Sequence, residues 1–144
     1  MYWGKYYLKE IEAPTGYELN NTEYPFTISA NTVSNRLIID IVNERQKGSI
    51  LLTKVDEKNE DTTLGGAVFT LYRSDGTIYL DDLVTGDDGK LLVKEIEWGS
   101  YYFLEKEAPE GYGLNPDKIR FAVNYLTAGK TQELIVTDPQ VTGE

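Results

Sequence analysis

Residues 98–115 read WGSYYFLEKEAPEGYGLN, and residues 3–20 of the same chain read WGKYYLKEIEAPTGYELN. Twelve of these 18 aligned positions are identical, and the two stretches are 95 residues apart (98 − 3). The same register continues toward the C-terminus without a gap, which is typical of a tandem array of repeats. We therefore expect one complete repeat over 48–141, the C-terminal half of a preceding repeat over 1–47, and the start of a further repeat at 142–144.

The composition excludes several classes of function. The chain has 14 basic and 24 acidic residues, and its net charge of -10 disfavours binding to nucleic-acid phosphate. The absence of His and Cys removes the usual zinc ligands, a thiol nucleophile, a Ser-His-Asp triad and disulfides. No apolar run approaches the roughly 18 residues that a membrane-spanning helix needs. We accordingly expect no metal, no cofactor, and neither nucleic acid nor membrane as a partner.

Alternating apolar and polar residues, with 11 Tyr and 13 Gly, predict an all-β chain. Turn signals recur about every 8–12 residues, as they do in β-sandwiches. Between the first and second strands of the complete repeat, residues 56–61 are expected to form a polar loop. The expected strands of the complete repeat are 48–56, 66–73, 77–80, 90–96, 100–107, 118–124 and 131–138. The expected strands of the half repeat are about 4–12, 24–29 and 37–43.

Three ionisable residues, Lys54, Glu105 and Asp138, each carry the only charge on an otherwise apolar strand face. Lys54, for example, shares its face with Ile50 and Leu52 because side chains two residues apart point the same way. Burying one unpaired charge costs on the order of several kcal/mol. Three such residues in one small domain therefore favour a joint explanation.

A reaction among the three side chains would supply that explanation. A desolvated lysine loses its proton more readily, and a buried carboxyl gains one. The neutral amine of Lys54 is then a nucleophile for Asp138, and Glu105 can act as general acid and base. The resulting amide removes two charges from the core. Taken singly, Lys54 could instead be an edge-strand lysine that prevents aggregation, Glu105 the end of a strand, and Asp138 a solvated linker residue.

The run YYFLEKEAPEGY at 101–112 resembles the YxLxExxAPxGY box of Cna B-type domains. These domains, also called SpaA-type pilin or prealbumin-like domains, occur in surface proteins of Gram-positive bacteria. Residues 48–56 resemble the opening strand of the family with its reactive lysine, and residues 135–138 resemble the final strand with its acceptor. The resemblance covers 48–141, and the half repeat matches from Trp3 onward.

The resemblance implies a reverse-immunoglobulin, Greek-key sandwich of about seven strands, preceded by a three-stranded half repeat. It also implies a spontaneous intramolecular isopeptide bond. In that bond Lys54 is the nucleophile, Glu105 the catalytic acid and base, and Asp138 the acceptor. In the half repeat, Glu10 and Asn43 match Glu105 and Asp138, whereas the position of the matching lysine precedes the first residue of the sequence.

The function implied by the resemblance is that of a structural stalk module in a cell-wall-associated adhesin or pilin. Such a protein lies outside the cell, on the surface of a Gram-positive bacterium. Bond formation would be a single-turnover reaction, so we do not expect an enzyme. One alternative is a ligand-binding module that recognises a host matrix protein or glycan. A second is an enzyme or regulatory domain, against which the absence of His, Cys and a phosphate-binding loop argues.

Residues 1–47 are expected to need a partner besides the neighbouring repeats of the same protein. The three strands of this half repeat would expose an apolar inner face, and such a face seeks a partner. We expect order by complementation, either from another chain or from a half domain that brings a lysine to Asn43. The face is drawn from Tyr6, Leu8, Phe26, Ile28, Ile39 and Ile41.

Overall fold

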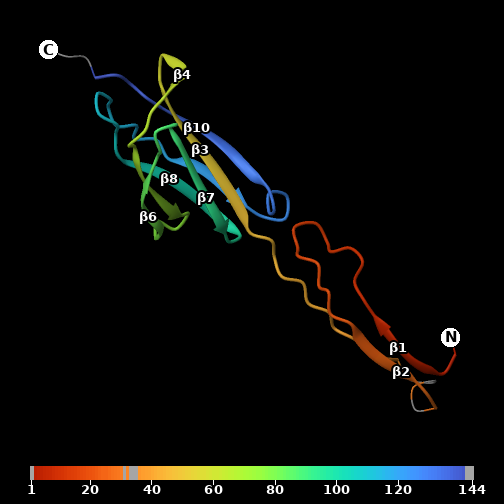
Figure 1. Ribbon diagram of the computed structural model, residues 1–144. Coiled ribbons are helices and arrows are strands. Elements are labelled where there is room, and N and C mark those ends of the chain that lie inside the picture. The colour runs from red at the N-terminus through yellow and green to blue at the C-terminus, as the bar shows by residue number, and fades with distance from the viewer. Residues whose placement is uncertain (1, 31, 33–35, 142–144) are drawn as a thin grey trace. The chain divides into compact units, whose positions relative to one another are not determined.

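The computed structural model describes residues 2–30, 32 and 36–141, and the proposed start of a further repeat at 142–144 lies outside them. The regular structure of these residues consists of β-strands, which confirms the all-β prediction. The chain divides into two compact units, Met1–Gln46 (unit 1) and Lys47–Glu144 (unit 2) (Figure 1). None of the described residues belongs to a helix long and apolar enough to cross a membrane.

Unit 2 consists of two sheets that face each other as a β-sandwich (Figure 1). In the first sheet, β3 pairs with β10, β4 and β7. The second sheet has the strand order β6-β5-β8-β9. The strands are β3 (Gly48–Asp56), β4 (Asn59–Thr63), β5 (Val68–Arg73), β6 (Ile78–Val84), β7 (Lys90–Ile96), β8 (Gly99–Glu107), β9 (Ile119–Val123) and β10 (Thr131–Asp138).

The hydrophobic core lies between the two sheets of unit 2. Ile50 and Leu52 of β3 have no exposed surface, and neither do Phe69 of β5 and Phe103 of β8. The rings of Phe69 and Phe103 meet edge to face, with their centroids 6.1 Å apart. Each such side chain stabilises the fold by about 1.5–3 kcal/mol when it is fully buried. The alternation of apolar residues along the strands therefore determines which face points inward.

The first and last strands of unit 2, β3 and β10, lie side by side and parallel. In this register Val136 is the partner of Lys54, and Asp138 is the partner of Asp56. The other strand pairs of both sheets are antiparallel. Because β3 and β10 come from opposite ends of the domain sequence, this pairing brings those ends together.

The described part of unit 2 has eight strands, one more than the seven that the sequence predicts. The additional strand is β4, and most of it falls in the segment 56–61, so the prediction of a loop there was wrong. All five residues of β4 are polar and exposed, so no apolar alternation marks the strand. It exists because its backbone pairs with Val55 and Asp56 at the end of β3.

The described part of unit 1 contains one antiparallel pair of strands, β1 (Gly4–Leu8) and β2 (Tyr24–Ile28). Its register is that of β8 and β9, with every partner shifted by 95 residues. Tyr6 is thus opposite Phe26, as Tyr101 is opposite Phe121. The repeat found in the sequence is therefore also a repeat of backbone geometry.

The third strand expected in unit 1, at 37–43, does not form, and residues 36–44 have no strand assignment. The corresponding segment of unit 2 is β10, whose pairing partner among the described strands is β3. The described residues of unit 1 include no strand equivalent to β3. The backbone groups of 37–43 therefore have no ladder to join, whatever the β-propensity of their side chains.

Candidate functional site

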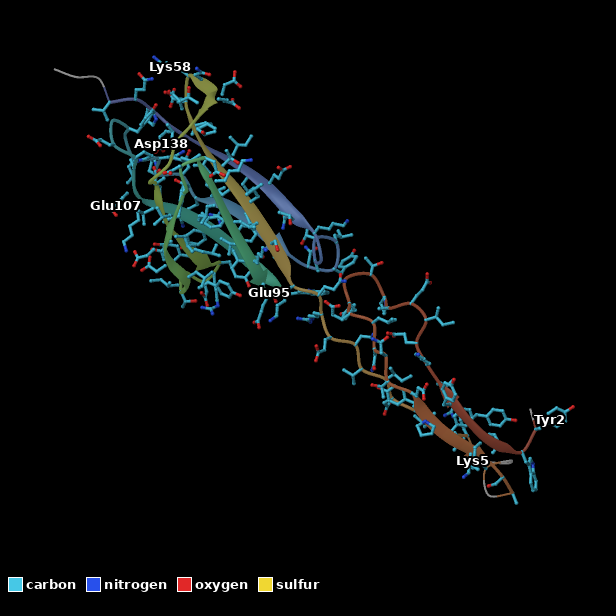
Figure 2. All side chains as sticks on the ribbon, in the orientation of Figure 1. Tyr2, Lys5, Lys58, Glu95, Glu107 and Asp138 are labelled. Atoms are coloured by element: carbon cyan, nitrogen blue, oxygen red, sulfur yellow. The ribbon has the colours of Figure 1, made fainter. Side chains whose placement is uncertain are left out.

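Lys54, Glu105 and Asp138 come together inside unit 2. Lys54 on β3 and Asp138 on β10 belong to one sheet, and Glu105 on β8 belongs to the opposite sheet. The exposed fractions of the three residues are 0%, 6% and 0%. In Figure 2, Asp138 lies among the side chains inside unit 2, whereas Lys58 and Glu107 lie at its outside. The inward faces that the sequence predicts for the three residues thus meet at one place.

The amine of Lys54 contacts both carboxyl groups. Its Nζ lies 3.0 Å from Oε2 of Glu105 and touches Oδ1 of Asp138. Nζ also donates a hydrogen bond of 3.3 Å to the carbonyl oxygen of Thr137. The ring of Phe69, with its centroid 5.5 Å from Nζ, adds an apolar wall. Among the described residues, no other donor reaches Oε2 of Glu105 or the carboxyl oxygens of Asp138. The three groups therefore compensate one another's charge in place of water.

Backbone contacts hold Lys54 in position. Its N–H donates to the carbonyl oxygen of Gly89, and its own carbonyl accepts from the N–H of Leu64, both at 2.8 Å. Gly89 has a φ of 76°, and a Cβ at this position would lie 2.7 Å from Cβ of Thr63 and 3.0 Å from the carbonyl oxygen of Lys54. Glycine is therefore required where the turn before β7 approaches β3.

Asn115, which is not among the site residues predicted from the sequence, also orders the site. Its N–H donates to Oε1 of Glu105 at 2.7 Å, and its Nδ2 donates to the carbonyl oxygen of Thr137 at 2.8 Å. Asn115 thus connects the carboxyl of one sheet with the last strand of the other. The signal was present in the sequence, because Asn20 and Asn115 are one of the identical pairs of the repeat.

The environment of Glu105 favours its protonated form. Burial, followed by the hydrogen bond with the carboxyl of Asp138, raises the pKa of Glu105 to about 7. The N–H of Asn115 and the ammonium of Lys54 oppose this shift but do not cancel it. Below about pH 7 Glu105 is therefore mostly protonated, and the formal charges of the three side chains then sum to zero.

Asp56, which the sequence predicts to be both the end of the first strand and the start of the polar loop, forms a second buried cluster. It is 2% exposed, and its Oδ2 accepts hydrogen bonds from the hydroxyl of Tyr112 at 2.8 Å and from Nε2 of Gln140 at 2.7 Å. The bond from Gln140 contributes most to a pKa of Asp56 below its ordinary value, followed by the N–H of Lys58. Asp56 thereby fixes the end of β3 to the loop after β8 and to the segment after β10.

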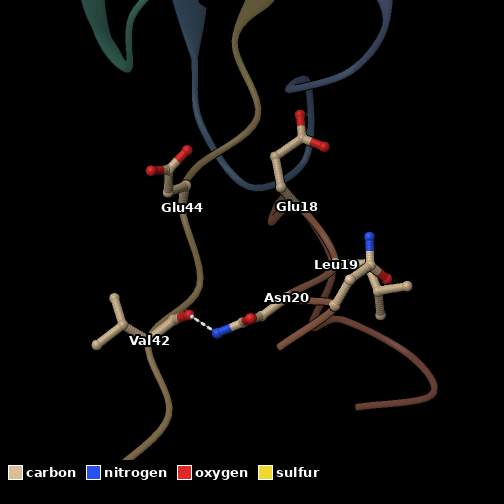
Figure 3. Close-up of a pocket in the computed structure, with 6 residues that line it drawn as sticks. Glu18, Leu19, Asn20, Val42 and Glu44 are labelled. Atoms are coloured by element: carbon tan, nitrogen blue, oxygen red, sulfur yellow. Dashed lines mark hydrogen bonds between the residues drawn. The ribbon is translucent and has the colours of Figure 1, made fainter. Parts of the chain in front are cut away.

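Unit 1 holds the two residues that match Glu105 and Asp138. Oε1 of Glu10 accepts hydrogen bonds from Nδ2 of Asn43 at 2.7 Å and from the N–H of Asn20 at 2.8 Å. The side chain of Asn20 donates to the carbonyl oxygen of Val42 at 2.8 Å, as Figure 3 shows. Glu10 and Asn43 are both partly buried. Unit 1 therefore assembles a carboxyl and a carboxamide in contact, without a lysine between them.

The facing sheets and the buried lysine-carboxyl cluster define a prealbumin-like β-sandwich. The chain belongs to the SpaA family of prealbumin-like fold domains, whose profile matches residues 2–43 and 48–140. The two matched ranges correspond to the two copies of the repeat. A comparison with curated protein sequences finds no match.

Solved structures of two Bacillus proteins and of a streptococcal pilus protein resemble the chain. The TIE protein of Bacillus anthracis has 30% identity and a TM-score of 0.75, over 96% of this chain and 25% of that one. BcpA, the major pilin subunit of Bacillus cereus, has 33% identity and a TM-score of 0.57, over 65% of this chain and 29% of that one. This chain therefore spans less than a third of either protein. The pilus 2b backbone protein of group B streptococcus, at 20% identity, shares the fold (TM-score 0.64, over 93% of this chain and 53% of that one).

Proposed function

We propose that unit 2 joins Lys54 to Asp138 through an intramolecular isopeptide bond, with Glu105 as acid and base. The observation that carries this proposal is the contact of Nζ of Lys54 with the carboxyl of Asp138, beside a glutamate whose pKa is raised to about 7. Attack requires a neutral amine and a polarised carboxyl group. A proton moving from the ammonium to the carboxylate supplies both without any change in the net charge of the site.

The reaction balances as a condensation. Nζ of Lys54 attacks Cγ of Asp138 and forms the C–N bond, and Glu105 relays a proton to the departing oxygen. The C–O bond breaks and one water molecule leaves. The product is a neutral amide, so one cation and one anion disappear from the core and their burial cost disappears with them. The fold supplies the effective concentration, and no turnover is required.

A bond between the first and last strands of unit 2 suits a stalk under tension. It would close a loop of 84 residues (138 − 54), for which the chain-entropy relation gives a stabilisation of the folded state by about 4.6 kcal/mol. A pulling force applied at the two ends of unit 2 would pass through the covalent link. The bond would thus replace disulfides in a chain that has no Cys.

We infer that the chain is a stalk segment of a pilus or adhesin on the outer surface of a Gram-positive bacterium. Its SpaA family membership and its similarity to the BcpA pilin support this function. The 95-residue repeat supports tandem neighbours as partners. In this proposal 48–141 is one complete domain and 1–47 is the C-terminal half of another.

The intact mass of the folded chain tests the proposed bond. We expect the wild-type mass to be about 18 Da below the sequence mass, because one water is lost. Glu105→Gln, which keeps the shape of the side chain but cannot relay a proton, should restore the full mass. Tandem mass spectrometry should place the link between Lys54 and Asp138. A correctly folded wild type with the full sequence mass would refute the bond and leave only the fold.

A further inference from the structure

Apolar burial alone leaves the position of β3 along β10 open to a slip of two residues. Side chains alternate along a strand with a period of two, so such a slip would keep Ile50 and Leu52 on the inner face. It would, however, move β3 by about 6.6 Å. Nζ of Lys54 would then leave the carboxyl of Asp138, which it contacts in the observed register. The proposed bond therefore depends on a feature that selects one register.

Asp56 selects the register of β3. It follows Lys54 by two residues and is 2% exposed. Its Oδ1 accepts a hydrogen bond of 2.8 Å from the N–H of Lys58, in the turn after β3. Its Oδ2 accepts from the hydroxyl of Tyr112 at 2.8 Å and from Nε2 of Gln140 at 2.7 Å. A slip of β3 would break the last two bonds and leave a buried carboxylate short of donors, which is costly.

The two donors to Oδ2 lie in the segments that position the carboxyl groups of the site. Tyr112 precedes Asn115 by three residues, and the N–H of Asn115 donates to Oε1 of Glu105 at 2.7 Å. Nδ2 of Asn115 donates to the carbonyl oxygen one residue before Asp138. Gln140 follows Asp138 by two residues, and an isolated β-bridge pairs it with Tyr112. The partners of Asp56 are therefore fixed relative to both carboxyl groups.

Unit 1 repeats these contacts under the 95-residue shift. An isolated bridge pairs Tyr17 with Arg45, as in unit 2. The N–H of Asn20 donates to Oε1 of Glu10 at 2.8 Å, which is again the bond made by the matching residues of unit 2. In both units the contacts stay within the segments that carry the glutamate, the acceptor and the loop between them. The carboxyl half of the site is thus ordered locally, and the element that remains to be placed is the strand of Lys54.

We propose that Asp56 is a positioning residue for the bond of unit 2, because it anchors β3 in the register that places Lys54 against Asp138. We call Asp56, Tyr112 and Gln140 together the β3 anchor. This inference rests on the bond proposed for unit 2. The atoms of Asp56 take no part in the covalent step. Its effect is on how often the amine and the acceptor carboxyl meet in the reactive geometry, and hence on the rate of the reaction.

The test measures the rate of bond formation during folding. The 144-residue chain is recovered unfolded from inclusion bodies, with its full sequence mass, and is diluted into native buffer. Circular dichroism follows folding, and intact mass after an acid quench follows the loss of water of about 18 Da. We expect Asp56→Asn to reach the strand content of the wild type and to lose water about tenfold more slowly, because a charge-assisted hydrogen bond to the anchor is lost.

Variants of the other two anchor residues show whether the anchor acts as a unit. Tyr112→Phe and Gln140→Ala each remove one donor and should slow the bond by a smaller factor than Asp56→Asn. Either change should add little to Asp56→Asn, because both act through the same carboxylate. Gln140→Arg introduces the residue that unit 1 has at the matching position, Arg45, and supplies a charged donor. It should retain the wild-type rate.

Val123→Ala is the control for a general loss of stability. Val123 is 1% exposed and lies on β9 opposite Gly99, where β8 begins, whereas Glu105 lies near the end of β8. The change removes buried methyl groups and destabilises the core. It leaves the β3 anchor intact, so the folded variant should form the bond at the wild-type rate.

The pH dependence separates positioning from an electrostatic effect on Glu105. Hydrogen bonds, with that of Gln140 the largest, hold the pKa of Asp56 below its ordinary value, so Asp56 is ionised between pH 6 and 9. Asp56→Asn should therefore slow the bond by the same factor throughout this range. The midpoint near pH 7 belongs to Glu105 and should not move. A displaced midpoint would show that Asp56 acts through the pKa of Glu105, and would overturn the positioning role.

The outcomes distinguish this inference from the proposed function. Bond formation at the wild-type rate in Asp56→Asn would overturn the β3 anchor and leave the bond of unit 2 standing, as would an equal slowing in Val123→Ala. If Asp56→Asn does not fold, Tyr112→Phe decides in its place, since it keeps the apolar surface of the ring. Slower bond formation in that variant supports the anchor, and an unchanged rate overturns it. A folded wild type with its full sequence mass would refute the proposed bond itself.

Discussion

Oε2 of Glu105 lies 3.0 Å from Nζ of Lys54, although the two residues belong to opposite sheets of the sandwich. This contact exists only when the sheets are packed together. The raised pKa of Glu105 has the same origin, because burial is its largest cause. The proposed chemistry should therefore begin only after the core has formed, with the packed sandwich as the template for the proposed cross-link.

Replacement of Asp138 by Asn should change the leaving group and nothing else. The amide product of Asp138→Asn is chemically identical to that of the wild type, since ammonia of about 17 Da leaves in place of water. Both folded proteins should therefore have the same intact mass. If the folded Asp138→Asn variant instead has a mass 1 Da below the sequence mass of the wild type, then no bond forms from the carboxamide.

Loss of the bond should lower stability without changing the fold. The free energy of unfolding of Glu105→Gln should be about 4.6 kcal/mol lower than that of the wild type. For a domain of this size the melting temperature should fall by roughly 20–35 °C. Calorimetry measures the change, and circular dichroism should show an unchanged strand content. The cross-linked Asp138→Asn variant is the control, and equal melting temperatures for all three proteins would contradict a mechanical role.

The rate of bond formation should fall as the pH rises through about 7. The reactive site is neutral only while Glu105 retains its proton, and burial raises the pKa of Glu105 to about 7. Above that pH the site loses a proton, and the rate should drop about tenfold per pH unit. Refolding from denaturant at pH 6–9 followed by intact mass measures it. A rate that increases steadily with pH would show that lysine deprotonation alone is limiting.

Phe69 should protect the site from water as well as stabilise the core. Phe69→Ala should cost about 3–5 kcal/mol of unfolding free energy. It should also slow the formation of the bond, because water admitted beside Lys54 lowers the pKa of Glu105. Phe121→Ala is the matched control, since it removes a core ring but not the one next to Nζ. Equal rates in the two variants would contradict this role.

Asp56 should stabilise unit 2 only while it is ionised. Its pKa in the folded state lies below the ordinary value of 3.8, chiefly because Gln140 donates to it. A lowered folded pKa contributes stability above the unfolded pKa, and that stability is lost as the pH falls through the folded pKa. Asp56→Asn should therefore lower the melting temperature at pH 7 and have a smaller effect below pH 3.8. Tyr112→Phe, which removes only one of the hydrogen bonds to Asp56, is the control. A difference in melting temperature between Asp56→Asn and the wild type that does not depend on pH would contradict stabilisation by the ionised form of Asp56.

Local patterns predicted the inward faces because side-chain direction depends only on the two-residue period of a strand. The 101–112 box, with its family resemblance, predicted the sandwich. The same patterns missed β4, whose five polar residues carry no apolar signal. They also predicted a strand at 37–43 that does not form. In both cases the presence or absence of a strand to pair with decided the outcome. The alternation of apolar and polar residues within a segment does not specify which strand will pair with it.

The sequence alone determined the 95-residue repeat, the β-class of the chain and the three charges on apolar faces. Tertiary structure decided that these charges touch, because the parallel pairing of β3 with β10 brings Asp138 beside Lys54 and the packing of the opposite sheet adds Glu105. It also decided that Asp56 is buried rather than exposed in a loop. The physical reason is that the period of a strand specifies which side a residue faces, whereas the register between strands specifies what it meets there.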